Sequence, residues 1–145
     1  MSTRVEPKRI DYYAKFFLLS TRWNDNDIYG HLNNVIYFEL FDTAINRFLI
    51  ENDLLCIEKS KEIGLVVDNR CTYFSSIKFP DLINVGIKVE KIGRTSVTYE
   101  IGIFKNDEKI TAAIGKFVHV YVDRYTNRPV NLPEKLRTEL LNLII

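Results

Sequence analysis

Ionisable and polar side chains gather in one short stretch near the start of this 145-residue chain. The stretch contains the carboxylates of Asp25 and Asp27, the imidazole of His31 and the carboxamides of Asn33 and Asn34. A helix is expected to begin directly after it, and the free amides of a first helical turn can stabilise a developing oxyanion. A carboxylate just upstream could attack a carbonyl held on those amides, or activate water against it. The stretch therefore favours chemistry at a carbonyl group.

The same residues also have a simpler interpretation. Asp and Asn favour turns, and Asn33 or Asn34 is a suitable helix N-cap because its side-chain oxygen can accept a bond from an orphan amide. His31 would then be a second capping group, and Asp25 and Asp27 would be solvated. Composition alone favours this interpretation, so the choice depends on the surrounding elements and on the spacing within the stretch.

The residues that follow predict a long helix over 33–53. Tyr37, Phe41, Ala44 and Phe48 recur at steps of four, three and four residues, which places them on one face. A helix of some twenty residues is about 30 Å long. Its apolar face therefore needs a large surface to cover it.

Strands are predicted on both sides of this helix. An apolar and aromatic run precedes it over 13–23, and the later segments alternate between apolar and polar residues. The predicted strands after the helix cover residues 65–79, 83–91, 96–104 and 109–125, and a short helix covers 134–143. The order of strand, helix and four strands predicts an antiparallel sheet rolled around one helix.

Composition narrows the class of protein. Hydrophobic residues make up 46% of the chain, and 20 basic side chains stand against 19 acidic ones. This balance argues against a dedicated nucleic-acid binder, and no apolar run is long enough to span a membrane. Cys56 and Cys71 match neither a disulfide framework nor a zinc site, and two histidines give no ligand-spaced pair. We expect one cytoplasmic domain over 1–145, loose at 1–11, without a metal.

The segment from Asp27 to Tyr37 has the pattern Asp-x-x-Gly-His-x-Asn-Asn-x-x-Tyr. This pattern resembles the signature of the 4-hydroxybenzoyl-CoA thioesterase family of hot-dog proteins, and the resemblance covers nearly the whole chain. It implies an α+β hot-dog fold, in which an antiparallel five-stranded sheet wraps around one long central helix. It also implies hydrolysis of an acyl-CoA thioester to free acid and CoA without a cofactor, since coenzyme A is part of the substrate.

The resemblance also implies roles for single residues. In that family the aspartate that matches Asp27 is the catalytic carboxylate, as nucleophile or as general base, and the backbone amide at Asn34 polarises the thioester carbonyl. His31 and Gly30 would form the pocket, and Asp25 should matter much less than Asp27. The residues expected to bind the acyl group or CoA are Asn33, Tyr37, Val66, Val67, Asp68, Asn69, Lys78, Arg94, Thr95 and Ser96.

Three alternatives stay open. The pattern also resembles the acyl-ACP thioesterases of plants and bacteria, whose Asp-x-Asn-x-His set matches Asp27 and His31 but has Asn where Tyr29 stands. A non-catalytic acyl-CoA-binding domain would keep the pocket without needing Asp27, and an interaction or scaffold protein would need neither. A hot-dog hydratase is disfavoured, because neither Asp25 nor Asp27 has the hydratase spacing from His31.

Assembly is the last expectation from the sequence. One sheet around one helix leaves strand edges open to pairing with another chain. The resemblance implies two-fold dimers, or a dimer of dimers, with each active site where two subunits meet. Asp27 of one chain would then lie near residues 66–69 of the other.

Overall fold

The computed structural model describes residues 4–145. Its strands are β1 (Lys15–Ser20), β2 (Glu62–Tyr73), β3 (Leu82–Ile92), β4 (Ser96–Lys105) and β5 (Ala113–Asp123). Its α-helices are α1 (Asn34–Glu51) and α2 (Glu134–Leu141), and short 3-10 turns cover Ile10–Tyr12 and Trp23–Asp25. No helix in this part of the chain is both long and apolar enough to cross a membrane.

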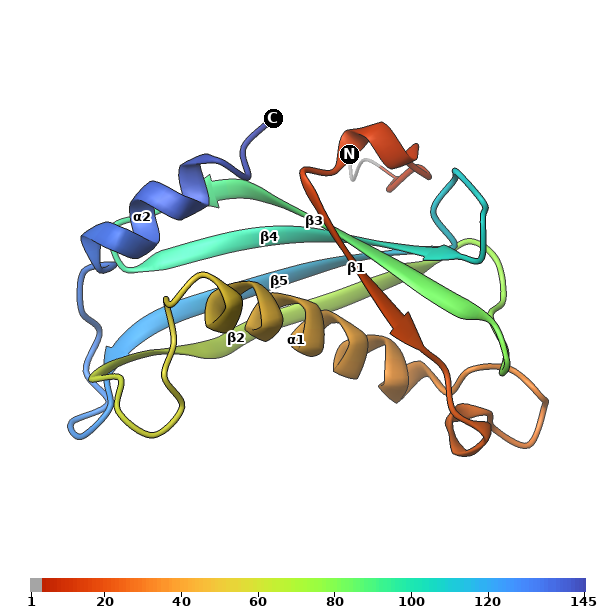
Figure 1. Ribbon diagram of the computed structural model, residues 1–145, viewed down its shortest axis with the longest axis horizontal. Coiled ribbons are helices and arrows are strands. Elements are labelled where there is room, and N and C mark those ends of the chain that lie inside the picture. Colours follow the sequence, from red (N-terminus) through yellow and green to blue (C-terminus); the bar gives the residue numbers. More distant parts are fainter. Residues whose placement is uncertain (1–3) are drawn as a thin grey trace.

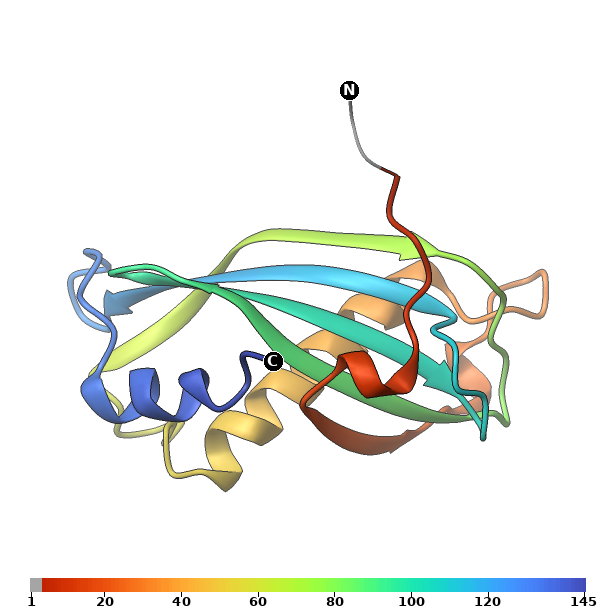
Figure 2. The same cartoon turned by 90° about the horizontal axis from the view of Figure 1, so that it is seen from above.

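The five strands form one antiparallel sheet in the order β1-β3-β4-β5-β2. Because β1 and β2 lie at opposite edges, the chain between them must cross the sheet, and α1 makes this crossing along one face (Figures 1 and 2). The predicted α+β hot-dog fold, a five-stranded sheet around one long helix, is confirmed.

The packing of α1 depends on side chains that alternate along the strands. The faces of β3 and β4 that turn toward α1 carry fully buried aliphatic residues such as Val85 and Ile101, and Phe41 of α1 is 0% exposed against them. Gly115 of β5 leaves the space for the Phe41 ring, since a Cβ there would lie 2.5 Å from ring atoms. The buried helix residues are Tyr37, Leu40, Phe41, Ala44, Ile45, Phe48 and Leu49.

The expected loose segment at 1–11 needs correction over its later part, while residues 1–3 lie outside the described residues. The amide of Lys8 donates to the Thr111 hydroxyl oxygen at 3.0 Å, and Arg9 forms a β-bridge with Ile110. The turn that follows places the Tyr13 ring over Gly102, where its hydroxyl donates to a Glu100 carboxylate oxygen at 3.1 Å. Aromatic anchoring therefore holds this segment, which polar composition alone did not indicate.

The element bounds also differ from the prediction in places. The first strand after α1 covers Glu62–Tyr73 rather than 65–79, because the amides of Phe74 and Ser75 both donate to the Ala112 carbonyl and turn the chain away. Residues 74–81 are therefore a connection across one end of the sheet. This connection becomes important for the site.

A buried histidine lies on the α1-facing side of β5. His119 is 2% exposed, and its ring packs edge-on against the rings of Tyr99, Phe117 and Tyr121. Its Nδ1 atom has no hydrogen-bond partner within residues 4–145. Burial lowers the pKa of His119 to about 4, because the apolar surroundings disfavour the charged form. The imidazole is therefore neutral in the folded protein at neutral pH.

The stability of the protein should fall as the pH drops from 6.5 toward 4. The unfolded chain binds a proton on His119 near pH 6.5, but the folded chain does so only near pH 4. This stabilisation is thus fully present above pH 6.5 and is lost through the window below, at up to about 1.4 kcal/mol per pH unit. Chemical denaturation across this window should give a shallower pH dependence for His119→Gln, and equal slopes would contradict the assignment.

Candidate active site

The polar stretch before α1 folds as a compact loop. The Asp27 amide donates to the His31 carbonyl at 2.8 Å, and the Gly30 amide donates to the Asp27 carbonyl at 3.1 Å. Gly30 has a φ of +80°, a left-handed conformation that a residue with a Cβ rarely adopts. The glycine in the motif is therefore needed for the turn that brings residues 27 and 31 together.

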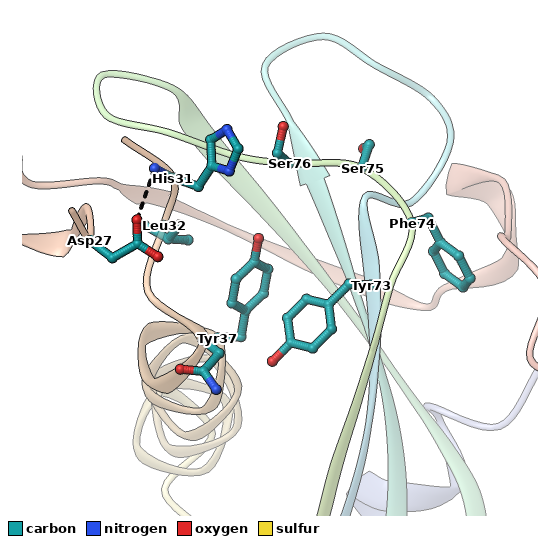
Figure 3. Close-up of a pocket in the computed structure, with 9 residues that line it drawn as sticks. Asp27, His31, Leu32, Tyr37, Tyr73, Phe74, Ser75 and Ser76 are labelled. Atoms are coloured by element: carbon teal, nitrogen blue, oxygen red, sulfur yellow. Dashed lines mark hydrogen bonds between the residues drawn. The ribbon is translucent and has the colours of Figure 1, made fainter. Parts of the chain in front are cut away.

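This turn orients the Asp27 carboxylate. Its Oδ1 atom accepts hydrogen bonds from the Tyr29 amide at 2.8 Å and from the His31 amide at 3.4 Å. Its Oδ2 atom accepts none from residues 4–145, and it points into the pocket beside α1 (Figure 3). The loop thus holds one carboxylate oxygen and leaves the other accessible from the pocket.

The start of α1 leaves one backbone donor unused. The Asn33 side chain caps the helix, since its Oδ1 atom accepts a hydrogen bond from the Val35 amide at 3.0 Å. The backbone carbonyl of Asn33 accepts a hydrogen bond from the Ile36 amide at 2.9 Å. The Asn34 amide has no acceptor in the part of the chain that the structure describes. A free amide at a helix N-terminus suits a carbonyl oxygen that gains negative charge.

The free oxygen and the free amide belong to residues that line one pocket of about 450 Å³ (Figure 3). Of the residues that the sequence singled out, Asp27, His31, Asn34 and Tyr37 meet here. The complete lining consists of Asp27, His31, Leu32, Asn34, Tyr37, Tyr73, Phe74, Ser75 and Ser76.

The far wall of the pocket is the part that the sequence did not predict. Tyr73 ends β2, and Phe74, Ser75 and Ser76 begin the connection to β3. The pair Ser75-Ser76, which interrupts an apolar run, was the one signal that the strand ends there. Proximity to Asp27 could not be inferred, because it depends on β2 lying at the sheet edge beside the start of α1.

Backbone bonds join the two walls. The Leu32 amide donates to the Ile77 carbonyl at 2.7 Å, and the Phe79 amide donates to the Asn26 side-chain oxygen at 3.0 Å. The Asp27 loop is therefore fixed to the connection that carries Ser75 and Ser76.

Two tyrosines of the pocket lining are in aromatic contact. The rings of Tyr37 and Tyr73 meet edge-on with centroids 4.8 Å apart. Burial raises the pKa of Tyr37 to about 12 and that of Cys71, beside it on β2, to about 11. Burial also raises the pKa of Tyr73. All three groups are therefore protonated at neutral pH.

The other predicted binding residues lie apart from this pocket. Gly30 shapes the loop and Asn33 caps α1, while Lys78 lines a neighbouring hollow of about 400 Å³ that shares His31 and Ser76 with the pocket. Val66, Val67, Asp68 and Asn69 lie along β2, an edge strand, where the first three are exposed.

Arg94, Thr95 and Ser96 lie at the opposite end of the sheet from the Asp27 loop. They lie at the turn between β3 and β4, where the Leu132 amide donates to the Arg94 carbonyl. The Asp27 loop instead follows the end of β1, which pairs with the start of β3 (Figure 1). Within one chain they do not line the pocket. The sequence could not show this, because the order of strands along the chain does not reveal the end of the sheet at which a connection lies.

Asp25 is buried rather than solvated, being 4% exposed. Its carboxylate accepts from the Arg22 amide at 2.8 Å and from the Arg22 guanidinium at 3.0 Å, and its carbonyl accepts from the Asn33 amide at 2.8 Å. Asp25 thus holds the entry to the loop and to α1, and it does not line the pocket.

A sheet wrapped on one helix, with a carboxylate and a helix-terminal amide at one pocket, is the arrangement of a hot-dog thioester hydrolase. The chain belongs to the thioesterase-like superfamily, whose family model matches residues 21–140. That range contains every residue of the pocket.

Known proteins support this membership. The crystal structure of the PA5185 protein of Pseudomonas aeruginosa strain PAO1 has a TM-score of 0.93 and 45% identity, and the match covers 96% of this chain and 97% of that one. The uncharacterized protein YsmA of Bacillus subtilis (strain 168) is 25% identical over 133 residues, 90% of this chain and 87% of that protein. A gentisyl-coenzyme A thioesterase shares the fold, with a TM-score of 0.78, 19% identity and coverage of 87% and 99%.

Asp25→Asn should destabilise the protein by about 1–3 kcal/mol, because it removes the charge from a buried carboxylate that receives the Arg22 bonds. Asp27→Asn should change stability by no more than about 0.5 kcal/mol, since it keeps the Oδ1 acceptor at a partly exposed site. Urea denaturation of both variants measures the difference. An equal loss in both would remove the structural role of Asp25.

Proposed function

We propose that this protein is an acyl-CoA thioesterase that hydrolyses an acyl-CoA to the free acid and CoA. The observation that carries the proposal concerns the Oδ2 atom of Asp27 and the amide of Asn34. Neither has a hydrogen-bond partner among residues 4–145, and both belong to residues of one pocket. A carbonyl group placed between them would meet a donor on its oxygen and a carboxylate at its carbon.

The reaction uses these two groups in either of two ways. The carbonyl oxygen accepts a hydrogen bond from the Asn34 amide, and the negative charge that develops on it is stabilised there. Asp27 then bonds to the carbonyl carbon and expels the thiolate, leaving an anhydride for water to cleave, or it takes a proton from the water that attacks. A single turnover in ¹⁸O-water identifies the first route when water attacks the Asp27 carbon of the anhydride, because the acid then leaves with an unlabelled Asp27 oxygen and the ¹⁸O stays on Asp27.

The thiol portion would leave the pocket past His31 and Ser76. Both residues are exposed, and both also line the neighbouring hollow that contains Lys78 and Lys105. Lys105 is bonded to the Ser76 carbonyl at 2.8 Å, whereas the Lys78 ammonium group has no partner among residues 4–145. Lys78 is therefore the cation we assign to a CoA phosphate. The gentisyl-coenzyme A thioesterase of the same fold is consistent with a CoA thioester as substrate.

Asp27→Asn should lower kcat by about 10²–10⁴-fold, because it removes the charge that both routes need while keeping the size of the side chain. The measurement is CoA release from a panel of short, long and aromatic acyl-CoAs. Asp107→Asn, which removes an exposed carboxylate on the turn after β4, is the matched control and should retain full activity. Near-full turnover by the Asp27 variant would exclude Asp27 from the mechanism.

Assembly follows from the edges of the sheet. β2 is an edge strand, and its side chains Leu65, Val66 and Val67 are 41%, 45% and 59% exposed. We infer that two chains pair through this region as a two-fold dimer, or as a dimer of dimers, which would cover these side chains. The stretch from Val66 to Asn69 would then complete the pocket of the partner chain.

Light scattering after size-exclusion chromatography should give at least twice the chain mass of 17.0 kDa. Val67→Lys should shift the protein toward the monomer and lower its activity, because it places a charge in the inferred interface. Leu18→Lys is the control, since Leu18 is also an exposed apolar residue but lies on β1 at the opposite edge. An active monomer would contradict both the dimer and the shared site.

A further inference from the structure

The hydroxyl group of Tyr37 has no protein partner. The side chain is 3% exposed, and it donates no hydrogen bond to any of residues 4–145. Figure 3 shows the hydroxyl pointing away from α1, into the space between Asp27, His31 and Ser76. A hydroxyl group that opens into a pocket without a protein partner can form its hydrogen bonds with a bound molecule or with water.

Two other tyrosines, Tyr13 and Tyr73, differ from Tyr37 in the surroundings of their side chains. The buried Tyr13 hydroxyl donates to Glu100 at 3.1 Å. The Tyr73 side chain, whose ring meets that of Tyr37, is 46% exposed. Of these two pocket tyrosines, Tyr37 is therefore the one whose side chain is enclosed.

The depth of Tyr37 indicates which part of a substrate it meets. The exposed lining residues form the rim of the pocket, and the Asn34 amide that would hold the carbonyl lies at this rim. These residues are His31, Asn34, Tyr73, Ser75 and Ser76. Tyr37 and Leu32 form the buried floor, at 3% and 5% exposed. A thioester whose carbonyl lies at the rim and whose thiol points outward extends its acyl group toward the floor.

We propose that Tyr37 is a specificity residue that selects acyl groups carrying an oxygen, as a hydroxyl or oxo group, on the portion that reaches the floor of the pocket. This inference rests on the proposed thioesterase function and adds the chemistry of its acyl group. A hydroxyl in this position forms a hydrogen bond with an oxygen of the acyl group. When that oxygen is missing, the Tyr37 hydroxyl is left without a hydrogen-bond partner. The raised pKa of Tyr37 keeps its proton in place for this bond through the neutral range.

The test uses two pairs of thioesters that differ by one oxygen: 3-hydroxybutyryl-CoA against butyryl-CoA, and 4-hydroxybenzoyl-CoA against benzoyl-CoA. Wild-type protein should favour the oxygenated member of at least one pair by about ten-fold or more in kcat/KM. Tyr37→Phe should bring that ratio close to one, mainly by slowing the oxygenated member. The pair that responds shows whether the acyl group is aliphatic or aromatic.

Tyr99→Phe is the matched control. Tyr99 is fully buried on β4, its hydroxyl also has no partner within the described residues, and it does not line the pocket. Its variant should keep the wild-type ratio. An unchanged ratio in Tyr37→Phe, an equal loss for both members of a pair, or a wild-type ratio near one in both pairs would overturn the proposal.

Failure of the proposed function is distinguishable from failure of this inference. Absence of CoA release from all four thioesters by the wild type would refute thioesterase activity toward them. The binding preference is measured separately, by calorimetric titration of the four thioesters into Asp27→Asn with and without Tyr37→Phe. Preference for an oxygenated member that disappears with Tyr37→Phe supports the specificity role, and equal affinities within both pairs refute it.

Discussion

The packing of α1 across the sheet is the constraint on which the rest of the structure depends. The Phe41 ring occupies the space that Gly115 leaves on β5, and this contact lies near the middle of a helix that joins the two edges of the sheet. Because the helix is held there, its first turn has a fixed position at one end of the sheet. The free Asn34 amide is therefore placed by the contact of the Phe41 ring with Gly115, two turns further along the helix.

The two carboxylates before α1 show how the same residue type takes opposite roles. Asp25 is enclosed and bonded to Arg22, so its charge is used to hold the chain. Asp27 receives two backbone bonds on one oxygen only, so its charge stays available at the pocket. The two residues are separated by a single residue, and the 3-10 turn over Trp23–Asp25 sends their side chains to different surroundings.

The sequence predicts the fold and one wall of the site, because both depend on local patterns. The spacing of Tyr37, Phe41 and Phe48 gives the helix, and the motif that ends at Tyr37 gives the loop with its glycine turn. The wall formed by Tyr73 to Ser76 depends on strand order, which alternation of residues does not reveal. The burial of Asp25 and the anchoring of Tyr13 likewise depend on distant partners. The predicted strands over 83–91 and 96–104 put Arg94 between two strands but do not show at which end of the sheet it lies.

The bonds between the two pocket walls have a consequence for how such proteins diverge. Leu32 is joined to Ile77 and Asn26 to Phe79, so the gap between the walls cannot widen without breaking these bonds. The width of the pocket is then fixed by the backbone and does not adapt to the bound molecule. Related chains that keep these bonds must change their acyl preference by exchanging side chains such as those at 37, 73 and 74. New substrates would therefore be acquired in discrete steps, one lining residue at a time.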